Sequence, residues 1–588
     1  MKTTIRIFNK EFYLPFFQKI SKAVSSFSLT EKVIFTVFAI ILIGTSLSML
    51  LRVNNQLLTE VPRFGGTLEE GLIDTPRFIN PLLALSETDR DLTALIYSGL
   101  MRITPEGGLI PDLAESVEIS EDGTEYLFKI RDDAFFHNGE PVTSDDVIFT
   151  ILKAQDPTIK SSKIATWDGI VIERLGDKEI LFILNQPYSP FLNNTTLGIL
   201  PSHIWQNISS EEFSFSQFNT EPIGSGPYKI KEVLKNKSGI AELYTLSAFD
   251  KFTLGKPNIK NIEFKFYTNE NSLISALKEG SIDSINSIST KSARDLDDNN
   301  FNVLQFPLPR IFGVFFNQSK APVLVSKSVR KALDTAIDRN ALIDSILGGY
   351  AQEARGPIPP SLIPFETLSS ASSKEPETGD EESEKLEDAR NILTEAGWEI
   401  NEEGFLQKES KSGTELLTFS LTTVNVPELV KVAEHVAETW RELGADVNVK
   451  IFDSNDLNQN VIRSRNYDAF LFGEIIGRDL DFYAFWHSSQ RNDPGLNIAD
   501  YANITVDKLL EDARGLSESP ERIEKFIAFD KEIQADIPAI FLYSPDFVYV
   551  VPDKLKGIVP DNITIPSERF ASVYNWYLET DTVWKFFK

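Results

Sequence analysis

Residues 311–360 read IFGVFFNQSKAPVLVSKSVRKALDTAIDRNALIDSILGGYAQEARGPIPP, and this stretch decides the fold class. It opens with a β-rich run and a short polar break. Apolar residues then recur at helical spacing, which predicts a helix around 329–337. A second helix from Asn340 ends at Gly348-Gly349, because glycine accepts the left-handed conformation of a helix end. A strand followed by two helices is typical of an α/β protein.

Working outward, two strand–helix–strand patterns lie far apart in the chain. In the first, two strands flank a helix within 264–285, and Asn269 caps this helix. In the second, strands at 417–421 and 447–451 flank a helix that begins at Pro427. Strands joined in this way lie parallel, with a right-handed crossover. Two such units predict two lobes, each with its own sheet, and a ligand site in the cleft between them.

Two shorter patterns add to this picture. Residues 116–131 alternate in hydrophobicity around Asp122-Gly123, which predicts a hairpin with a tight turn. Thr143 followed by Asp146 forms a capping-box pattern, which predicts the start of a helix.

Length and composition restrict the function. The chain has 588 residues, of which 42% are hydrophobic and 11% aromatic, as in a globular protein with more than one lobe. Its formal charge of −28 argues against nucleic acid as a partner, since phosphate binding needs a basic surface. The chain has no cysteine, which excludes disulfides, thiolate chemistry and a lipid-modified cysteine anchor.

An apolar segment near the N-terminus predicts a membrane anchor. Residues 33–51 carry no charge, and a helix of that length rises roughly 28 Å, enough to cross the bilayer core. Residues 1–32 contain six Lys or Arg against two Glu, so they are expected to stay cytoplasmic, with the C-terminal part outside. A cleaved signal peptide is the alternative, but residues 51–62 show no small-x-small cleavage site. We therefore expect a single-pass cell-membrane protein.

The rest of the chain divides into a tether, globular parts and one insertion. Residues 52–63 are expected to form the tether, and the sequence is globular from Phe64. Residues 369–388 contain few apolar side chains and eight acidic residues, which predicts a solvated loop.

Several ordered blocks carry a resemblance to a known family. They are GGTLEEGLIDTPRFINPLLA (65–84), the long block from Ile96 to Ile151, GSGPYKI (224–230), the opening stretch 311–360 and ARNILTEAGW (389–398). Together they resemble the extracellular solute-binding proteins, family 5, which serve oligopeptide and dipeptide ABC importers.

The resemblance implies an α/β fold of the type II periplasmic-binding-protein class, with two lobes and an extra subdomain in lobe one. It implies a monomer that captures a peptide or a similar small polar solute and delivers it to ABC permease subunits, without a cofactor. The expected boundaries are 64–90, 218–306 and 541–588 for lobe I, 91–217 for the extra subdomain and 307–540 for lobe II.

The block Tyr467–Trp486 resembles the segment that lines the cleft in this family. Peptide-binding members carry an aspartate that pairs with the ligand's amino group, but the equivalent position here is Ile476 or Gly477. Asp479 and Asp481 match the acidic positions that follow, and they are expected either to anchor an ammonium group or only to shape a turn. Glu474 is a further candidate for the same anchoring role.

Other candidates have equally plain alternatives. Tyr483 and Trp486 could line side-chain pockets or fill the core. Arg478 could bind a ligand carboxylate or lie on the surface. Phe78 follows the first strand, where open α/β sheets receive ligands.

No enzymatic site is expected. The four histidines are scattered without metal-ligand spacing, and neither a G-x-S-x-G elbow nor a phosphate-binding loop is present. Three alternatives to peptide capture stay open. They are an oligosaccharide or metal-chelate binder, a sensory ectodomain that uses the same fold, and an extracellular hydrolase whose nucleophile is missing.

Overall fold

The chain forms two compact units, Met1–Arg63 with Glu579–Lys588, and Phe64–Leu578. Residues 579–588, which the sequence assigns to lobe I, thus group with the N-terminal segment. The computed structural model describes residues 4–7, 10–13, 23–105, 107–188, 190–299, 301–363, 382–410, 413–453, 456–477, 480–516, 519–559 and 563–587.

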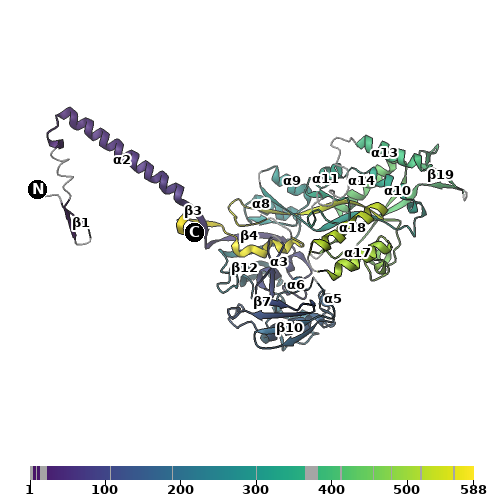
Figure 1. The fold of residues 1–588 in the computed structure, drawn as a ribbon, viewed down its shortest axis with the longest axis horizontal. Coiled ribbons are helices and arrows are strands. Elements are labelled where there is room, and N and C mark those ends of the chain that lie inside the picture. Colours follow the sequence, from purple (N-terminus) through teal and green to yellow (C-terminus); the bar gives the residue numbers. More distant parts are fainter. Residues whose placement is uncertain are drawn as a thin grey trace. The chain divides into compact units, whose positions relative to one another are not determined.

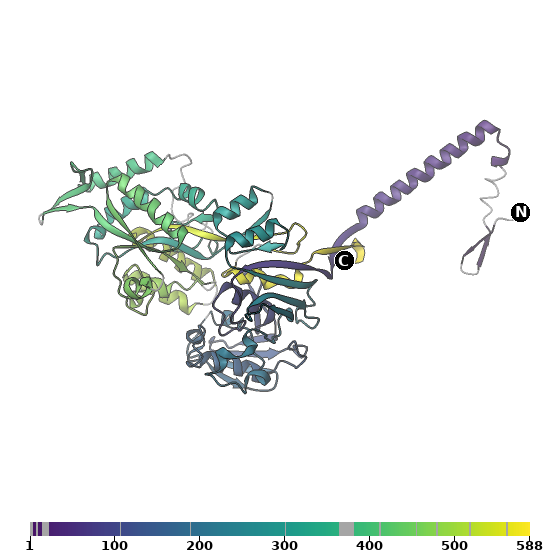
Figure 2. The same ribbon diagram turned by 180° about the vertical axis from the view of Figure 1, so that it is seen from behind.

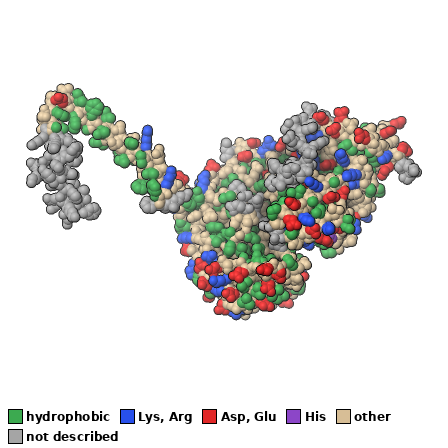
Figure 3. Space-filling model, viewed as in Figure 1, with side chains coloured by type: hydrophobic (Ala, Val, Ile, Leu, Met, Phe, Trp, Pro, Cys, Tyr) green, Lys and Arg blue, Asp and Glu red, His purple; other side chains and the backbone are tan. Residues whose placement is uncertain are grey.

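The smaller unit is built around one long apolar helix, α2 (Leu29–Leu57), which Figure 1 shows. Its first turn is capped by Ser28, whose backbone N–H and hydroxyl both donate to the Glu31 carboxylate. Residues 29–54 are long and apolar enough to cross a membrane by length and composition, and Figure 3 shows hydrophobic side chains along them. The helix contains the predicted span 33–51 and extends beyond both of its ends.

Helix α2 continues directly into strand β3 (Leu58–Arg63), which pairs antiparallel with β25 (Glu579–Trp584). A short 3-10 helix, η7 (Lys585–Phe587), follows β25. The same unit contains an antiparallel hairpin of β1 (Thr4–Ile7) and β2 (Lys10–Tyr13).

The larger unit is organised by one sheet that runs through both lobes (Figures 1 and 2). On the lobe I side its strand order is β11-β12-β13-β4-β14. These strands are β4 (Gly65–Ile73), β11 (Tyr228–Lys235), β12 (Ala241–Ala248), β13 (Ile259–Tyr267) and β14 (Ser284–Ile285). Strands β13 and β14 both run parallel to β4, which lies between them, so the first predicted strand–helix–strand unit is confirmed.

On the lobe II side the order is β16-β23-β21-β22. These strands are β16 (Arg310–Phe316), β21 (Thr418–Val424), β22 (Asp446–Phe452) and β23 (Ala469–Ile475). Strands β21 and β22 are parallel and joined by α14 (Pro427–Leu443), which ends at Gly444 with a φ of 112°, as the sequence predicts.

Two chain segments connect the lobes. The long strand β24 (Ala539–Val551) pairs through its first residues with β16 and β17 (Ala351–Glu353) in lobe II. Its later residues pair with β14 and with β15 (Asn302–Pro307) in lobe I. The chain crosses a second time between β15 and β16. Two adjacent crossing strands form a hinge, about which two lobes can close.

Lobe II has helices on both faces of its sheet, because side chains of β16 alternate in direction. Val314 and Phe316 pack with one set of helices, while Ile311 and Phe315 pack with the other. The first set is α10 (Lys327–Thr335), α11 (Arg339–Ile346), α13 (Glu382–Glu395) and α14. The second set is α16 (Tyr483–Trp486), α17 (Ile504–Gly515) and α18 (Pro520–Asp536). A small sheet of β18 (Glu399–Ile400), β19 (Leu406–Ser410) and β20 (Gly413–Leu416) completes the lobe.

An additional subdomain inserts into lobe I, shown in dark blue in Figures 1 and 2. Its four-stranded sheet has the order β7-β8-β10-β9. These strands are β7 (Ala114–Ile119), β8 (Glu125–Ile130), β9 (Val171–Arg174) and β10 (Glu179–Ile183), with β5 (Met101–Ile103) and β6 (Leu109–Pro111) as a separate pair. Its helices are α4 (Ser144–Gln155), α5 (Ile164–Trp167), α6 (Phe191–Asn194) and α7 (Ser202–Trp205).

The predicted hairpin and capping box both form in this subdomain. Strands β7 and β8 are antiparallel, and Gly123 in their turn has a φ of 68°. The Asp146 carboxylate accepts hydrogen bonds from the backbone N–H and the hydroxyl of Thr143.

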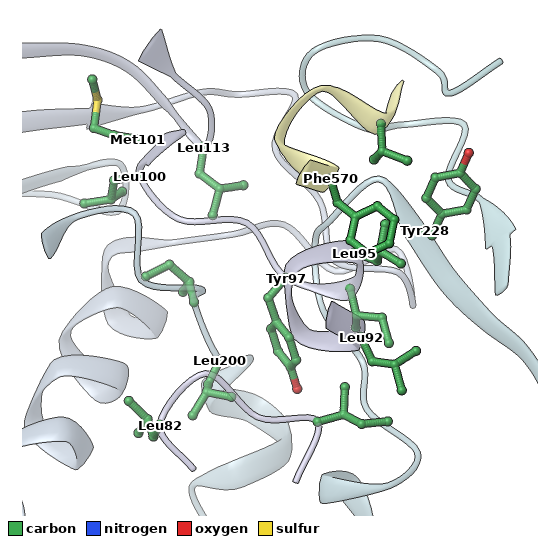
Figure 4. Packing of buried hydrophobic residues seen from close by; sticks show 14 of the residues in the cluster. Leu82, Leu92, Leu95, Tyr97, Leu100, Met101, Leu113, Leu200, Tyr228 and Phe570 are labelled. Carbon is green, nitrogen blue, oxygen red and sulfur yellow. The ribbon is translucent and has the colours of Figure 1, made fainter. Parts of the chain in front are cut away.

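Lobe I has three main helices, α3 (Glu87–Ile96), α8 (Glu270–Lys278) and α9 (Thr290–Asp297). Leu92 and Leu95 of α3 enter the core with Tyr228 and Phe570, and Figure 4 shows this packing. A single continuous core unites lobe I with its subdomain.

One sequence expectation is wrong. Residues 382–388, predicted to belong to a solvated loop, form the first half of α13. The reason is an apolar stripe that begins at Leu386 and continues through Ala389 and Leu393, and these side chains are buried with those of α10. The preceding part of the predicted loop lies outside the described residues.

Candidate functional site

The site begins with the direction of the strands in lobe I. Strands β4 and β13 are parallel and end side by side at Ile73 and Tyr267. Strand β24 runs in the opposite direction, so its entry into lobe I at Asp546 lies at the same edge. This edge receives the carboxyl ends of the parallel strands, where open α/β sheets bind ligands.

Lobe II presents a similar edge. The parallel strands β21, β22 and β23 all end toward one side, and Ile475 at the end of β23 pairs with Arg310 at the start of β16. Tyr543 of β24 pairs with Phe312 close to this edge. In both lobes, the edge at which the parallel strands end therefore lies next to the two crossing strands.

Two charged side chains at the crossing have unsatisfied atoms. Arg310 Nε and Asp546 Oδ1 are both buried, and neither has a hydrogen-bond partner among the residues that the structure describes. Burial raises the pKa of Asp546 to about 6. Such groups are available to a ligand or to a rearrangement of the hinge.

A cavity of about 670 Å³ lies between the subdomain and lobe II. The subdomain contributes the β7–β8 turn together with Tyr126, Tyr188 and Leu192, and lobe II contributes the end of α17 at Arg514, Gly515 and Leu516. This volume is within the range of small-molecule binding sites. Smaller cavities of about 180, 310 and 240 Å³ are lined by residues of lobe I and its subdomain.

Arg514 organises the lobe II side of the large cavity. Its Nε lies 3.0 and 3.2 Å from the two carboxylate oxygens of Asp481, and a second nitrogen lies 2.5 Å from Oδ2. The guanidinium carbon is 4.1 Å from the centre of the Tyr483 ring. Burial disfavours the charge of Arg514, but the hydrogen bonds that it donates to Asp481, together with the negative charge of Asp481, outweigh burial and raise the pKa of the guanidinium.

The aromatic side of this cluster continues with His487. The Tyr483 and His487 rings are stacked, with centroids 4.0 Å apart. His487 Nδ1 is 2.8 Å from Ser489 Oγ, and its Nε2 is 3.3 Å from a Glu511 oxygen. The structure thus brings together two predicted residues, Asp481 and Tyr483, with partners from α17.

Glu474 and Trp486 form a separate buried pair. The Trp486 indole N–H donates to Glu474 Oε2 at 3.2 Å, and within the described ranges Oε1 has no hydrogen-bond partner. Burial raises the pKa of Glu474 to about 8. Trp486 itself packs against Phe315 and Phe541 in the core of lobe II, which favours the packing interpretation of this residue.

The other predicted residues lie elsewhere. Phe78 is half-buried against the core of lobe I, and its backbone N–H donates to the Asp89 carboxylate at 2.9 Å. Arg478 and Asp479 lie outside the described residues.

Sequence reasoning missed the residues that approach the cavity from other elements. Arg514 lies in the last turn of an amphipathic helix, where a basic residue is an ordinary feature. Tyr126 and Tyr188 belong to the subdomain, and no motif distinguishes them from core aromatics. Among the described residues, no group of three or more His, Cys, Asp or Glu side chains is arranged to hold a metal ion.

The family model for bacterial extracellular solute-binding proteins, family 5, middle region, matches residues 108–495. The chain belongs to this family. Its two lobes, the extra subdomain and the inter-lobe cavity agree with that membership, and the resemblance seen in the sequence is confirmed.

Individual relatives extend over most of the chain. The oligopeptide-binding protein AppA of Bacillus subtilis is 29% identical over 525 residues, which are 88% of this chain and 92% of AppA. The structure of AppA with a nonapeptide has a TM-score of 0.65 and 27% identity, covering 88% of this chain and 100% of AppA. NikZ of Campylobacter jejuni, solved with Ni(L-His), has a TM-score of 0.65 and 28% identity, covering 87% of this chain and 99% of NikZ.

Proposed function

We propose that this solute-binding protein captures oligopeptides or dipeptides outside the cell and presents them to the permease subunits of an ABC importer. The observation that carries this proposal is the cavity of about 670 Å³ between two lobes that are joined by two crossing strands. The structure of AppA, which matches 88% of this chain, has been solved with a nonapeptide.

The mechanism follows from the hinge. A ligand that contacts both the subdomain and the end of α17 gains interactions only when the lobes are close, so it favours the closed state. Closure changes the outer surface of the protein, and the permease can distinguish loaded from empty protein by that surface. The bound molecule is transferred unchanged, and no catalytic group takes part.

We propose a ligand site built around Asp481, Tyr483 and Arg514. Asp481 and Arg514 hold each other in place, and the aromatic ring of Tyr483 gives an apolar contact surface. Arg478 and Asp479 remain proposed ligand contacts because they follow β23, whose end lies at the cleft edge. Glu474 and Trp486 are proposed to support this wall from behind, and Phe78 is proposed as a contact on lobe I.

The chain is further proposed to be a monomer held at the membrane by α2. The basic N-terminal residues favour a cytoplasmic N-terminus, which leaves the ligand-binding unit outside the cell. This arrangement replaces the lipid-modified cysteine that the sequence lacks.

A second candidate is capture of a metal chelate, and the similarity to NikZ with Ni(L-His) favours it over a sugar or a sensory role. The test is mass spectrometry of ligands released by denaturation from the full chain, purified in detergent. Recovered peptides would support the proposal. A recovered nickel complex, measured in the same sample by elemental analysis, would replace it.

A further inference from the structure

A second cavity, of about 310 Å³, lies between α3 of lobe I and helices α5 and α6 of the subdomain. Its wall carries two cations, Arg90 and Lys163. Neither forms an ion pair with a carboxylate of the described residues. This is unexpected in a protein with a net charge of −28, in which acidic partners are abundant.

The cations lie close enough to repel each other. The pKa of Lys163 is lowered, mainly because the surrounding protein removes water from the ammonium group and to a smaller extent by the positive charge of Arg90. Part of the Lys163 side chain is nevertheless exposed to solvent. Burial lowers the pKa of Arg310 at the hinge, and the positive charge of Arg90 lowers it further. The negative charge of Glu87 acts on Arg310 in the opposite direction. The other acids of α3 are engaged, Asp89 with backbone N–H groups and Asp91 with Arg569.

Two residues of the same wall carry buried hydroxyl groups that have no hydrogen-bond partner among the described residues. The Tyr97 side chain is 4% exposed and lines the cavity, and its hydroxyl is buried without a hydrogen-bond partner in the part of the chain that the structure describes. Figure 4 shows this hydroxyl pointing away from Met101 and Leu113. Thr93 Oγ1 is likewise buried, and no described residue forms a hydrogen bond with it. Arg90 and Thr93 are three residues apart on one face of α3, and Tyr97 is the C-cap residue at the end of this helix.

Two cations and two free hydroxyl donors are the groups that bind an oxyanion. Burial raises the pKa of Tyr97, so its hydroxyl keeps the proton that it would donate. Asn193 lines both this cavity and the larger inter-lobe cavity. To bind Arg90, a ligand in the larger cavity would have to extend an acidic group past Asn193.

We propose that Arg90 and Lys163, with the Tyr97 hydroxyl, bind a carboxylate of the captured ligand, so that the protein prefers acidic ligands. This inference rests on the proposed function. A free oxyanion such as phosphate has the same chemistry and is the other source that the experiment distinguishes.

The experiment compares the full chain with the double variant Arg90→Gln/Lys163→Gln by calorimetry. The probes are two synthetic hexapeptides that differ only in three Glu-to-Gln replacements, and sodium phosphate alone. The native chain is expected to bind the acidic peptide about tenfold more tightly, and the variant is expected to lose this preference. Lys331→Gln, an exposed change on α10, is the matched control and keeps the preference.

The outcomes are distinguishable. An equal peptide preference in native and variant chains would overturn the inference while leaving peptide capture intact. Phosphate binding that disappears in the variant, without any peptide preference, would assign the site to a free anion and overturn the ligand-carboxylate role. If neither peptide bound the native chain, the proposed function would be wrong, and with it this role of the site. Circular dichroism confirms that the variants are folded.

A different observation, in the smaller unit, carries a second inference. Strand β25 ends at Trp584, which pairs with Leu58, the first residue after α2. The Trp584 indole N–H donates to Asn54 Oδ1 at 3.0 Å, and Asn54 is the last residue of the apolar span. Trp584 is 48% exposed and Phe586 is 76% exposed, with Lys585 between them.

Aromatic and basic residues of this kind collect at the boundary between bilayer and water. We infer that the segment Trp584–Phe586 inserts its aromatic side chains into the outer lipid interface, beside the end of α2. This inference rests on the proposed anchoring of α2. A second contact beside the helix would limit how freely the tether tilts.

The absence of cysteine makes this inference directly testable. Phe586→Cys is labelled with an environment-sensitive fluorophore, and the full chain is reconstituted into liposomes. Blue-shifted emission that is quenched by spin-labelled lipid headgroups is expected. Phe215→Cys, which replaces an 85% exposed phenylalanine of the larger unit, is the control and should report water. Emission from position 586 that equals the control would overturn the inference. Flotation of the liposomes separately tests whether α2 anchors the chain.

Discussion

Arg514 and Asp481 form a bidentate ion pair across 33 residues of sequence, with nitrogen–oxygen distances of 2.5 to 3.2 Å. The Asp481 carboxylate is therefore already neutralised inside the protein. It fixes the guanidinium against Tyr483 at the wall of the inter-lobe cavity, and an incoming ammonium group would have to compete with Arg514 for it.

Asp481→Asn tests the role of this pair. An asparagine amide carries no charge and offers only one acceptor oxygen, so it cannot form the bidentate ion pair with Arg514. The Arg514 side chain then becomes mobile at the cavity wall. Affinity for the ligand is expected to fall about five- to tenfold by calorimetry. The free energy of unfolding should change by less than about 1 kcal/mol, because the pair is partly exposed.

The matched control for this change is Asp512→Asn. Asp512 pairs with Lys525 at 2.9 Å and lies on the same helix as Arg514, but its partner, unlike Arg514, does not line the cavity. Affinity should stay at the native value. Equal losses in both variants would show that the ion pairs matter only for the stability of α17.

The sequence predicted the parts of the fold that depend on local patterns. The β21–α14–β22 unit follows from a proline at the helix start, a glycine at its end and one apolar stripe. Residues 447–451, predicted to be a strand, lie within β22. The pattern does not show that β22 is the edge of the sheet, where Ile451 is 45% exposed.

The candidate site could be predicted only in part, because its walls come from distant segments. Tyr467–Trp486 supplies Asp481 and Tyr483, which the sequence identified. Their partner Arg514 and the opposing Tyr188 reach the cavity through tertiary packing of lobe II and the subdomain. No periodicity or motif in the sequence predicts that Arg514 and Tyr188 line the same cavity. The buried state of Glu474 likewise depends on packing between β23 and α16.

Arg569→Met should strongly destabilise lobe I. Arg569 donates to Glu70 at 2.6 Å and to Asp91 at 2.7 and 2.8 Å, and all three side chains are buried. Its removal leaves two buried carboxylates without compensation, which costs about 3–5 kcal/mol in urea denaturation. Adding Asp91→Asn should recover part of the loss. Arg174→Met, at an exposed ion pair, should change stability by only about 0.5 kcal/mol.

His137 should make the subdomain sensitive to acid. Its ring lies between Gly224 N–H at 3.3 Å and Gly226 C=O at 3.1 Å, and burial lowers its pKa from 6.5 to about 4. Between pH 6.5 and 4 this histidine is protonated in the unfolded chain but neutral in the native chain. The free energy of unfolding therefore falls by about 3 kcal/mol as the pH decreases from 6.5 to 4. His137→Asn should reduce this slope in denaturation experiments at pH 7 and 4.5. An unchanged slope would contradict the assignment.

Glu474 should produce the opposite pH dependence. Burial raises its pKa from 4.5 to about 8, because Glu474 is only 2% exposed. The hydrogen bond that the Trp486 N–H donates to the carboxylate lowers the pKa, but by less than burial raises it. The unfolded chain loses this proton above pH 4.5, while the native chain keeps it until about pH 8. The contribution of Glu474 to native stability is therefore complete below pH 4.5 and is lost as the pH rises to 8, on the order of 4 kcal/mol. Glu474→Gln keeps an acceptor for Trp486 and cannot ionise. Urea denaturation should show the variant gaining stability relative to the native chain between pH 5 and 8, and parallel curves would contradict a protonated Glu474.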